Sequence, residues 1–429
     1  MAEQHKPVEH DVIAAAKAAR QAAQRRRSRT TIAVLATITA AWFVYVTVAG
    51  HWVRVGNNWQ ATLTMVFGSF VAGSTPQGGG AVAFPVFTKV LEVPSEVART
   101  FSLSIQAVGM TAASIGMIIG RRLGEWRAII IGGATAAVSF LVALFLVSDT
   151  SKPFWPAVLP APYIRVTFTL VLASMAFIVY LGTRVPIRKV DTSLPPMNAR
   201  LYVALVVAGI LGGVFSALTG SGADVMIYLF IVVLFGVDPK VGVPSCVMTM
   251  AVVSIVGFLV LGVGDGHLSV QLSEGTSGDV VAVAGQSVSM VEVDGRTAPA
   301  FAAGEDGLPA RRFDLFGLWL AAIPIVVWGA PLGSWFASRI NARQLVVFAG
   351  LLAAVELITT IIFIPDLHRV SGLSIYAVSG LVSMLLGLYL LARYRRVLFG
   401  LPPLSPEETL HRGSLDVRPG YERHLGDDD

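Results

Sequence analysis

Charged residues are scarce in this chain. They make up 14% of its 429 residues, whereas soluble proteins carry about 25%. A large soluble core does not explain this deficit, because its surface would still need charge. Long apolar segments do explain it, since each crossing of a bilayer needs roughly 20 mostly apolar residues. The low charge therefore excludes an ordinary soluble enzyme and predicts an all-α integral membrane protein.

The chain has a single cysteine, and no histidine lies within an expected transmembrane span. The single Cys246 excludes an intrachain disulfide framework, and its apolar surroundings favour a small buried side chain. The chain has no Gly-x-x-x-x-Gly-Lys-[Ser/Thr] phosphate loop, which argues against an ATPase. Thr219-Gly220-Ser221-Gly222 resembles the Gly-x-Ser-Gly of an intramembrane serine protease, but no histidine lies in an expected span to activate the serine. We expect no catalytic residues, no metal and no cofactor.

Basic residues account for the formal net charge of +5, and they cluster beside apolar segments. This is the pattern of a membrane protein that obeys the positive-inside rule, and it gives no reason to expect nucleic acid as a partner. The basic segment 1–29 precedes the apolar stretch 30–50. Because this stretch is longer than the apolar core of a typical signal peptide, we interpret it as an uncleaved first span, with cleavage after 48–50 as the alternative.

Eight apolar segments have the length of full transmembrane helices. They lie at about 30–50, 97–119, 128–147, 163–183, 241–263, 314–337, 344–364 and 371–392. The segment 264–312 differs, because it holds seven acidic and three basic residues with many Gly, Ser and Val. Alternation in 280–283 and 288–293 predicts a short hairpin there, with a disordered loop as the alternative.

Two further apolar elements, 61–92 and 200–235, are interrupted by glycine. The first contains Gly73-Ser74-Thr75-Pro76-Gln77-Gly78-Gly79-Gly80, and the second contains Thr219-Gly220-Ser221-Gly222-Ala223-Asp224. A helix does not run comfortably through a proline followed by three glycines. We therefore expect each element to be two short half-helices joined by non-helical backbone.

The arginines indicate how these two elements sit in the bilayer. If each element returns to the side it came from, the basic clusters near 121–127, 184–200, 339–343 and 393–396 all share the side of the N-terminus. The first hairpin then enters from outside and the second from inside. Two units related in this way are inverted repeats, an architecture found in many secondary transporters.

This topology divides the chain into seven parts and places it in the cell inner (plasma) membrane with both termini cytoplasmic. The parts are a basic N-terminal segment (1–29), an extra first span and loop (30–60), repeat A (61–183), a cytoplasmic linker (184–199), repeat B (200–364) with an extracytoplasmic insert (264–312), an extra last span (365–392) and a flexible cytoplasmic tail (393–429).

The first hairpin carries a family resemblance. Phe67-Gly68-Ser69-Phe70-Val71-Ala72-Gly73, then Gly78-Gly79-Gly80, Pro85 and Val93-Pro94, resemble the sulfite exporter TauE/SafE family of membrane transporters. Pro331-Leu332-Gly333-Ser334 resembles a recurring small-residue turn of the same family. The resemblance covers about 61–364 and implies transport of sulfite, organosulfonates or related organic anions without ATP hydrolysis. The chain departs from the family pattern in Gly220-Ser221-Gly222-Ala223-Asp224 and in the insert.

The two interruptions predict an anion site. Unwound backbone survives inside a bilayer only where it lines a cavity or meets a ligand, and helix N-termini bind anions through their free N–H groups. Small residues that merely permit close helix packing are the alternative. The expected substrate-binding residues are Ser74, Thr75, Gln77, Gly78, Gly79, Gly80, Gln106, Thr219, Gly220, Ser221 and Gly222.

Three charged residues at membrane depth need their own explanation. Asp224 is a candidate for proton coupling, or else a carboxylate favoured by the start of a helix. Glu356 is a second coupling candidate, or else the partner of a buried donor. Arg99 is expected to extend to the lipid head groups rather than to attract anions at the outer mouth.

The sequence therefore predicts a secondary transporter for a small anionic solute, with proton coupling and a homo-oligomer left open. An anion channel is the first alternative, because a channel can use the same half-helix dipoles. A membrane sensor or scaffold that uses the 264–312 insert is the second. Counterflow distinguishes a carrier from a channel, and absence of flux distinguishes a sensor from both.

Overall fold

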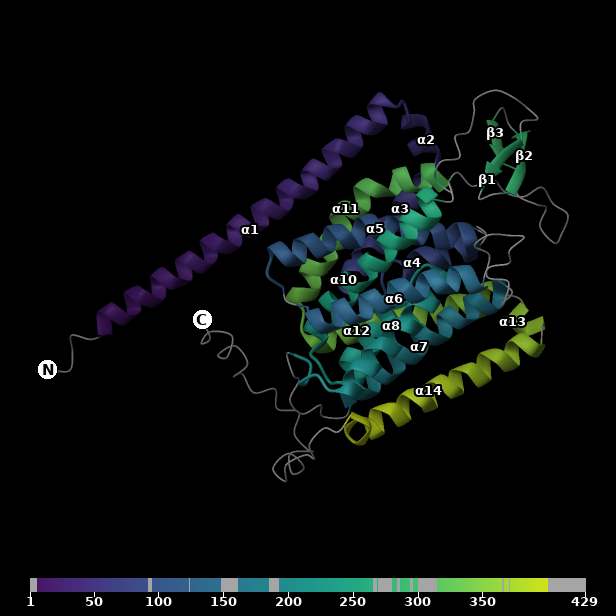
Figure 1. Cartoon of the computed structure of the whole chain (residues 1–429). Helices are drawn as coiled ribbons and strands as arrows, with labels where there is room; N and C mark the ends of the chain where they lie inside the picture. Colours follow the sequence, from purple (N-terminus) through teal and green to yellow (C-terminus); the bar gives the residue numbers. More distant parts are fainter. Residues whose placement is uncertain are drawn as a thin grey trace.

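The computed structural model is a bundle made almost wholly of helices (Figure 1). It describes residues 6–91, 95–122, 124–147, 161–184, 193–264, 268, 280–283, 286–293, 296–299, 315–364, 366–369 and 371–399. Within these ranges, seven helices are long and apolar enough to cross a membrane. They are Ala15–Val48, Ala98–Ile119, Trp126–Phe145, Ala199–Thr219, Pro239–Gly264, Leu315–Arg339 and Arg343–Phe363. The prediction of an all-α integral membrane protein is confirmed.

The helices follow the predicted spans closely. In chain order they are α1 (Lys6–Val48), α2 (Trp52–Asn57), α3 (Trp59–Ser74), α4 (Gly80–Pro85), α5 (Ser95–Ile119), α6 (Trp126–Val147), α7 (Ala161–Arg184), α8 (Ala199–Thr219), α9 (Ala223–Tyr228), α10 (Pro239–Gly257), α11 (Leu315–Arg339), α12 (Ala342–Phe363), α13 (Asp366–Arg369) and α14 (Ser371–Phe399). Three π-helical turns extend α4, α9 and α10, namely η1 (Val86–Val90), η2 (Leu229–Leu234) and η3 (Phe258–Gly264).

The first helix break lies between α3 and α4. Thr75 has extended backbone angles (φ −131°, ψ 159°), because the ring of a following proline, here Pro76, disfavours the helical region. Gly78 then turns the chain with φ +65°, a conformation that glycine adopts without steric cost. The predicted interruption of 61–92 is therefore present and has a local cause.

The second break lies between α8 and α9, and its arms are unequal. Gly220 ends α8 with φ +77° and Gly222 follows with φ +148°. α8 has 21 residues, and at 1.5 Å per residue this length crosses a hydrocarbon core of about 30 Å. The expectation of two short half-helices is wrong for α8. Only the arm formed by α9 and η2 is short.

The two broken elements enter the bundle from opposite ends. The hydroxyl of Thr62, early in α3, donates to Ala321 O, early in α11. Arg127, at the start of α6, donates to Leu194 O and so lies beside the approach to α8. Arg122, just before α6, donates to Ser334 Oγ near the end of α11. α3 thus begins at the end of the bundle where α11 begins, and α8 begins at the other.

Helix packing has the same pattern in both halves of the chain. α3 packs against α11 as α8 packs against α6, while α5 contacts α10 and α7 contacts α12. Exchanging α3 with α8, α5 with α10, α6 with α11 and α7 with α12 leaves these pairs unchanged. This is the packing expected of an inverted duplication. The exact boundaries of the repeats stay a prediction.

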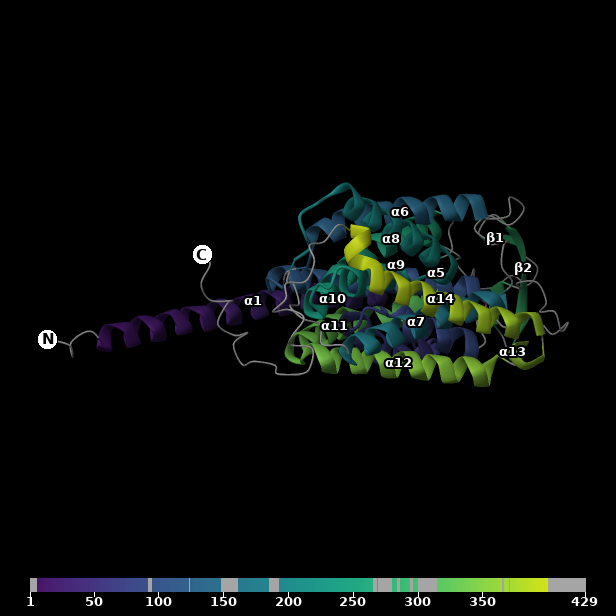
Figure 2. The same ribbon diagram turned by 90° about the horizontal axis from the view of Figure 1, so that it is seen from below.

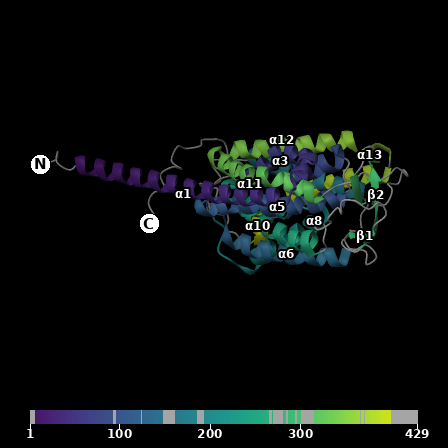
Figure 3. The same cartoon turned by 90° about the horizontal axis from the view of Figure 1, so that it is seen from above.

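α1 and α14 flank this core. α1 contacts α11 and α5, and its first turns project beyond the bundle (Figures 1 and 3). α14 lies on the outside against α7 (Figure 2). The first turn of α1 and the last turn of α14 lie at the same end of the bundle, opposite the small sheet (Figure 1).

The insert contains three antiparallel strands, in the order β1-β2-β3: β1 (Val280–Val283), β2 (Gln286–Val293) and β3 (Arg296–Pro299). Val280 pairs with Ser289 and Val293 with Arg296. The predicted hairpin is confirmed, and a third strand extends it. Apart from Gly264 and Leu268, the rest of the insert lies outside the described residues, as does the tail from 400.

Candidate functional site

The two helix breaks meet in the interior of the bundle. A Cβ atom on Gly78 would overlap Asp224 Oδ2, and one on Gly80 would overlap the Ser221 side chain. Ser221 and Asp224 are fully buried. Close approach therefore requires glycine at both positions, and at Gly78 the backbone conformation (φ +65°) requires it as well. The structure brings together the two segments that the sequence predicted to face each other.

Side chains of α5 hold the second break in place through hydrogen bonds. Gln106 Nε2 donates to Gly220 O (2.9 Å) and to Ser102 Oγ (2.7 Å), and Ser102 Oγ also donates to Gly220 O (3.2 Å). Gln106 Oε1 lies 3.2 Å from the position of a Cβ on Gly78. The amide of Gln106 thus lies between the two breaks and bonds the carboxyl end of α8, and its role in binding substrate stays a prediction.

Asp224 holds α9 with one oxygen and faces the first break with the other. Oδ1 accepts from the N–H groups of Gly222 (3.1 Å) and Val225 (3.0 Å), as a carboxylate at a helix start does. Within the part of the chain that the structure describes, Asp224 Oδ2, Ser221 Oγ and Gln106 Oε1 have no hydrogen-bond partner. Three unsatisfied polar atoms, all buried, therefore gather around Gly78 and Gly80, and each is a candidate contact for a polar ligand.

The backbone donors of the two breaks differ. In the first break Thr75 N–H still bonds Val71 O, and the next N–H groups to bond a helical carbonyl are those of Val82 and Ala83. The amides at 78–81 thus lie outside the helical ladder. In the second break Gly220 N–H bonds Ser216 O and Gly222 N–H bonds Asp224 Oδ1. The expectation that the Gly220 and Gly222 amides face a ligand does not match this arrangement, because both are already bonded.

Four of the predicted side chains hydrogen-bond to backbone carbonyls at or near the breaks. The hydroxyls of Ser74, Thr75 and Thr219 donate to carbonyls one helical turn earlier, and Thr219 also donates to Ser221 O (2.6 Å). Gln77 Nε2 donates to Ala349 O of α12 (2.9 Å). These side chains therefore satisfy backbone carbonyls. The groups that face the contact are the backbone of 78–80, Gln106, Ser221 and Asp224.

Glu356 belongs to a separate buried cluster. Its Oε1 lies 2.6 Å from Lys89 Nζ and accepts from Thr169 Oγ1 (2.9 Å), and Lys89 also donates to Thr360 Oγ1 (2.8 Å). Of its two interpretations, the structure shows the partner of a buried donor. Lys89 was not among the predicted residues, although it is the only charged residue between 61 and 91. A lone charged residue in an apolar hairpin indicates a buried partner or a functional role, and this pattern could have identified Lys89.

Arg99 is buried rather than extended to the head groups. Its Nη1 donates to Ala217 O (3.0 Å), near the carboxyl end of α8, and the residue is 2% exposed. A cation at this end of a helix is favoured by the helix dipole. The expectation that Arg99 extends to the lipid surface is wrong, because its carbonyl partner lies in the other half of the chain.

The fold and this site define a multi-pass membrane protein whose centre is the contact between two broken helices. A family model described as Sulfite exporter TauE/SafE matches residues 61–290, more than half of the chain. The chain belongs to this family, and it is a membrane transporter of the sulfite exporter type. No curated protein matches it, and no solved structure does.

Proposed function

We propose that this chain is a secondary transporter that carries sulfite, an organosulfonate or a related small organic anion between its two helix breaks. The observation that supports this most is the position of Asp224, whose carboxylate lies against Gly78 in the first break. Asp224 Oδ2, Ser221 Oγ and Gln106 Oε1 lack a hydrogen-bond partner among the described residues. A small polar solute between the two breaks would contact all three.

The donors for such an anion come from the first break. The amides at 78–81 precede an arm of six α-helical and five π-helical residues, so the partial positive charge of a helix start favours an anion there. The Ser221 hydroxyl is a neutral donor on the opposite side. Gln106 Nε2 now bonds Ser102 Oγ and Gly220 O, and a change of rotamer would let it donate to the substrate instead. No arginine or lysine is needed in this arrangement, which suits a carrier that must also release its substrate.

Asp224 then couples transport to protons. An anion cannot enter while an ionised carboxylate occupies its place, and an unpaired carboxylate at membrane depth costs several kcal/mol. Protonation of Asp224 removes both obstacles, because it cancels the repulsion and lets Oδ2 donate to the substrate. The proton and the anion therefore enter together. Glu356 is not used in this step, since its oxygen is committed to Lys89.

We propose that the protein lies in the inner membrane with its basic end in the cytoplasm. Arg122 and Arg339 lie at the end where α1 begins, and the small sheet lies at the other (Figure 1). The positive-inside rule then assigns both termini to the cytoplasm and the insert to the outside.

Flux through reconstituted protein tests this proposal. Purified protein in liposomes is expected to take up labelled sulfite with saturation, and unlabelled sulfite inside should accelerate uptake by counterflow. Sulfoacetate and other small anions serve as competitors that rank the substrate class. Current without counterflow would assign an anion channel instead. Absence of flux for every anion tried would contradict transport by this site.

A further inference from the structure

α1 and α11 enclose a groove at the basic end of the bundle. Its volume is about 700 Å³. One wall is a single face of α1, which contributes Arg20, Gln24, Arg27, Thr31 and Leu35. This spacing of three to four residues is the repeat of a helix face. α11 and the end of α5 supply the other walls.

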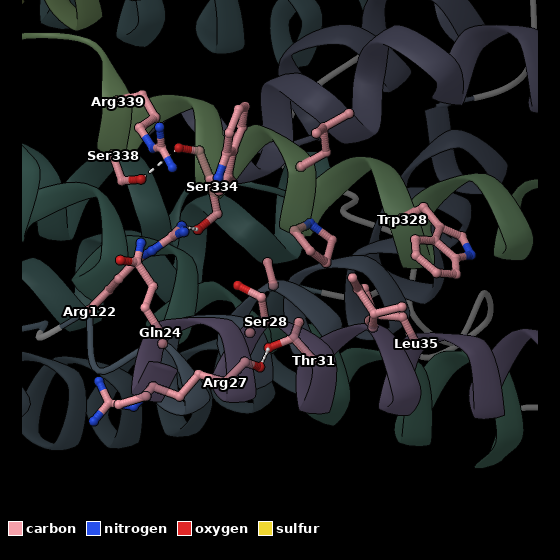
Figure 4. Close-up of a pocket in the computed structure, with 18 of the residues that line it drawn as sticks. Gln24, Arg27, Ser28, Thr31, Leu35, Arg122, Trp328, Ser334, Ser338 and Arg339 are labelled. Carbon is pink, nitrogen blue, oxygen red and sulfur yellow. Dashed lines mark hydrogen bonds between the residues drawn. The ribbon is translucent and has the colours of Figure 1, made fainter. Parts of the chain in front are cut away.

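The groove is basic at one end and apolar at the other. Figure 4 shows Arg27, Arg122 and Arg339 on one side of it and Trp328 and Leu35 on the opposite side. The order of residues along the two antiparallel helices gives the same gradient. On α1 the arginines precede Ile32 and Leu35, and on α11 Trp328 and Leu332 precede Arg339.

The positive charge in this groove is not compensated. Within the part of the chain that the structure describes, no acidic residue lines it, and Arg20, Arg27, Arg122 and Arg339 form no ion pair. Arg122 donates to the hydroxyl of Ser334 (3.1 Å), and the guanidinium of Arg339 lies over the Trp335 ring, 4.8 Å from its centroid. Burial and the nearby charge of Arg339 lower the pKa of Arg122. Like charges held together in this way attract an anionic group.

The apolar end of the groove fits a hydrocarbon chain. Ile32, Leu332, Trp328 and Trp335 line it and remain exposed. The eight residues from Arg27 to Leu35 rise by about 12 Å along α1, so a group bound at the arginines would have its apolar part beside these side chains. Trp328 Nε1 donates to Thr39 Oγ1 (3.0 Å), which ties α11 to α1 at the deep end of the groove.

We propose that this groove binds one anionic phospholipid of the leaflet at the basic end, with its phosphate among Arg20, Arg27, Arg122 and Arg339 and an acyl chain along Ile32 and Leu332. Basic pockets between transmembrane helices are suited to such head groups. A soluble anion would satisfy the arginines but would leave the apolar half of the groove unused. The lipid would hold α1, which has few contacts of its own, against the transport core.

Lipid retention tests this proposal. The purified full chain is mixed with phosphatidylglycerol or phosphatidylcholine in detergent, and bound lipid is measured by native mass spectrometry. The double variant Arg122→Gln/Arg339→Gln should weaken phosphatidylglycerol binding by about 30-fold, the effect of two arginines near an anionic lipid. The matched control Arg121→Gln/Arg343→Gln removes the same charge from exposed positions at the same end, outside the groove lining, and should retain binding.

A second pair of variants separates binding from folding. Arg20→Gln/Arg27→Gln changes only α1, whose side chains there are exposed or half-buried, so the core should fold unchanged and phosphatidylglycerol binding should again weaken. Equal loss in the groove variants and in the control would contradict the proposal, as would equal binding of both lipids. Displacement of the lipid by millimolar inorganic phosphate would also contradict it, because it would show a site for a free anion.

Discussion

The carboxylate of Asp224 lies against the backbone of Gly78, although the two residues belong to different halves of the chain. This contact joins the breaks of two helical hairpins that enter the bundle from opposite ends. It places an acidic oxygen beside the non-helical backbone of the first break. The proposed binding, release and coupling steps all depend on how this contact opens.

Adding a single methyl group at Gly78 should therefore block transport. In Gly78→Ala the new Cβ overlaps Asp224 Oδ2, and the residue has φ +65°, which costs an L-residue roughly 1–2 kcal/mol. We expect loss of sulfite flux and a lower unfolding temperature in detergent. Gly350→Ala is the control, because its Cβ would meet nothing within 4 Å and α12 should gain up to about 1 kcal/mol. Wild-type flux in Gly78→Ala would show that the contact is not part of the pathway.

The hydroxyl of Ser221 should contribute to substrate binding. It is buried beside Gly80 and has no hydrogen-bond partner among the described residues, so its removal leaves the resting structure intact. A lost hydrogen bond to a charged ligand is worth about 1.5–3 kcal/mol, and Ser221→Ala should raise the KM for sulfite by roughly 10- to 100-fold. Ser114→Ala on α5, whose hydroxyl bonds Met110 O, should leave KM unchanged. Equal KM values for all three proteins would remove Ser221 from the site.

The pair of Lys89 and Glu356 should be structural, with strongly non-additive substitutions. Both side chains are less than 5% exposed, so Lys89→Met or Glu356→Leu leaves one charge unpaired and should cost about 3–5 kcal/mol. The double variant Lys89→Met/Glu356→Leu should recover most of that loss. Thermal unfolding of the four proteins gives the coupling energy. Additive effects would indicate that the two charges do not stabilise each other.

Cysteine labelling should show which end of the bundle faces the outside of the cell, because the native cysteine contributes little labelling of its own. The native Cys246 is fully buried in α10 and should not react with a membrane-impermeant maleimide. A cysteine introduced at Ser289 in β2 should be labelled in intact cells. One introduced at Ser338, exposed near the end of α11, should be labelled only after the cells are opened. The reverse pattern would invert the proposed topology.

The sequence allowed the helix breaks to be predicted because their causes are local. Pro76 and Gly78 act on their own backbone, and Gly220 and Gly222 do the same in the second break. The opposite entry of the hairpins followed from the positions of arginines, which need no knowledge of packing. The family resemblance rested mainly on the first hairpin, with Gly78, Gly79 and Gly80 at its break.

Contacts between distant segments could not be predicted in this way. Lys89 and Glu356 pair across 267 positions, and Arg99 donates to a carbonyl 118 positions away. Neither partner is identifiable without the fold. The hydroxyls of Ser74 and Thr75 were expected to face a ligand, yet each lies beside a backbone carbonyl one turn earlier in the chain, and this nearer acceptor is the one it uses.

The pH dependence of sulfite flux in Asp224→Asn tests the central claim most directly. Asparagine keeps the size of the side chain and the acceptor for Gly222 and Val225 but cannot ionise. Flux through the variant should lose its rise toward acidic pH and its stimulation by a proton gradient. Asp238→Asn, which keeps the cap of α10, should behave like wild type. Proton-stimulated flux in Asp224→Asn equal to that of the wild type would contradict the account.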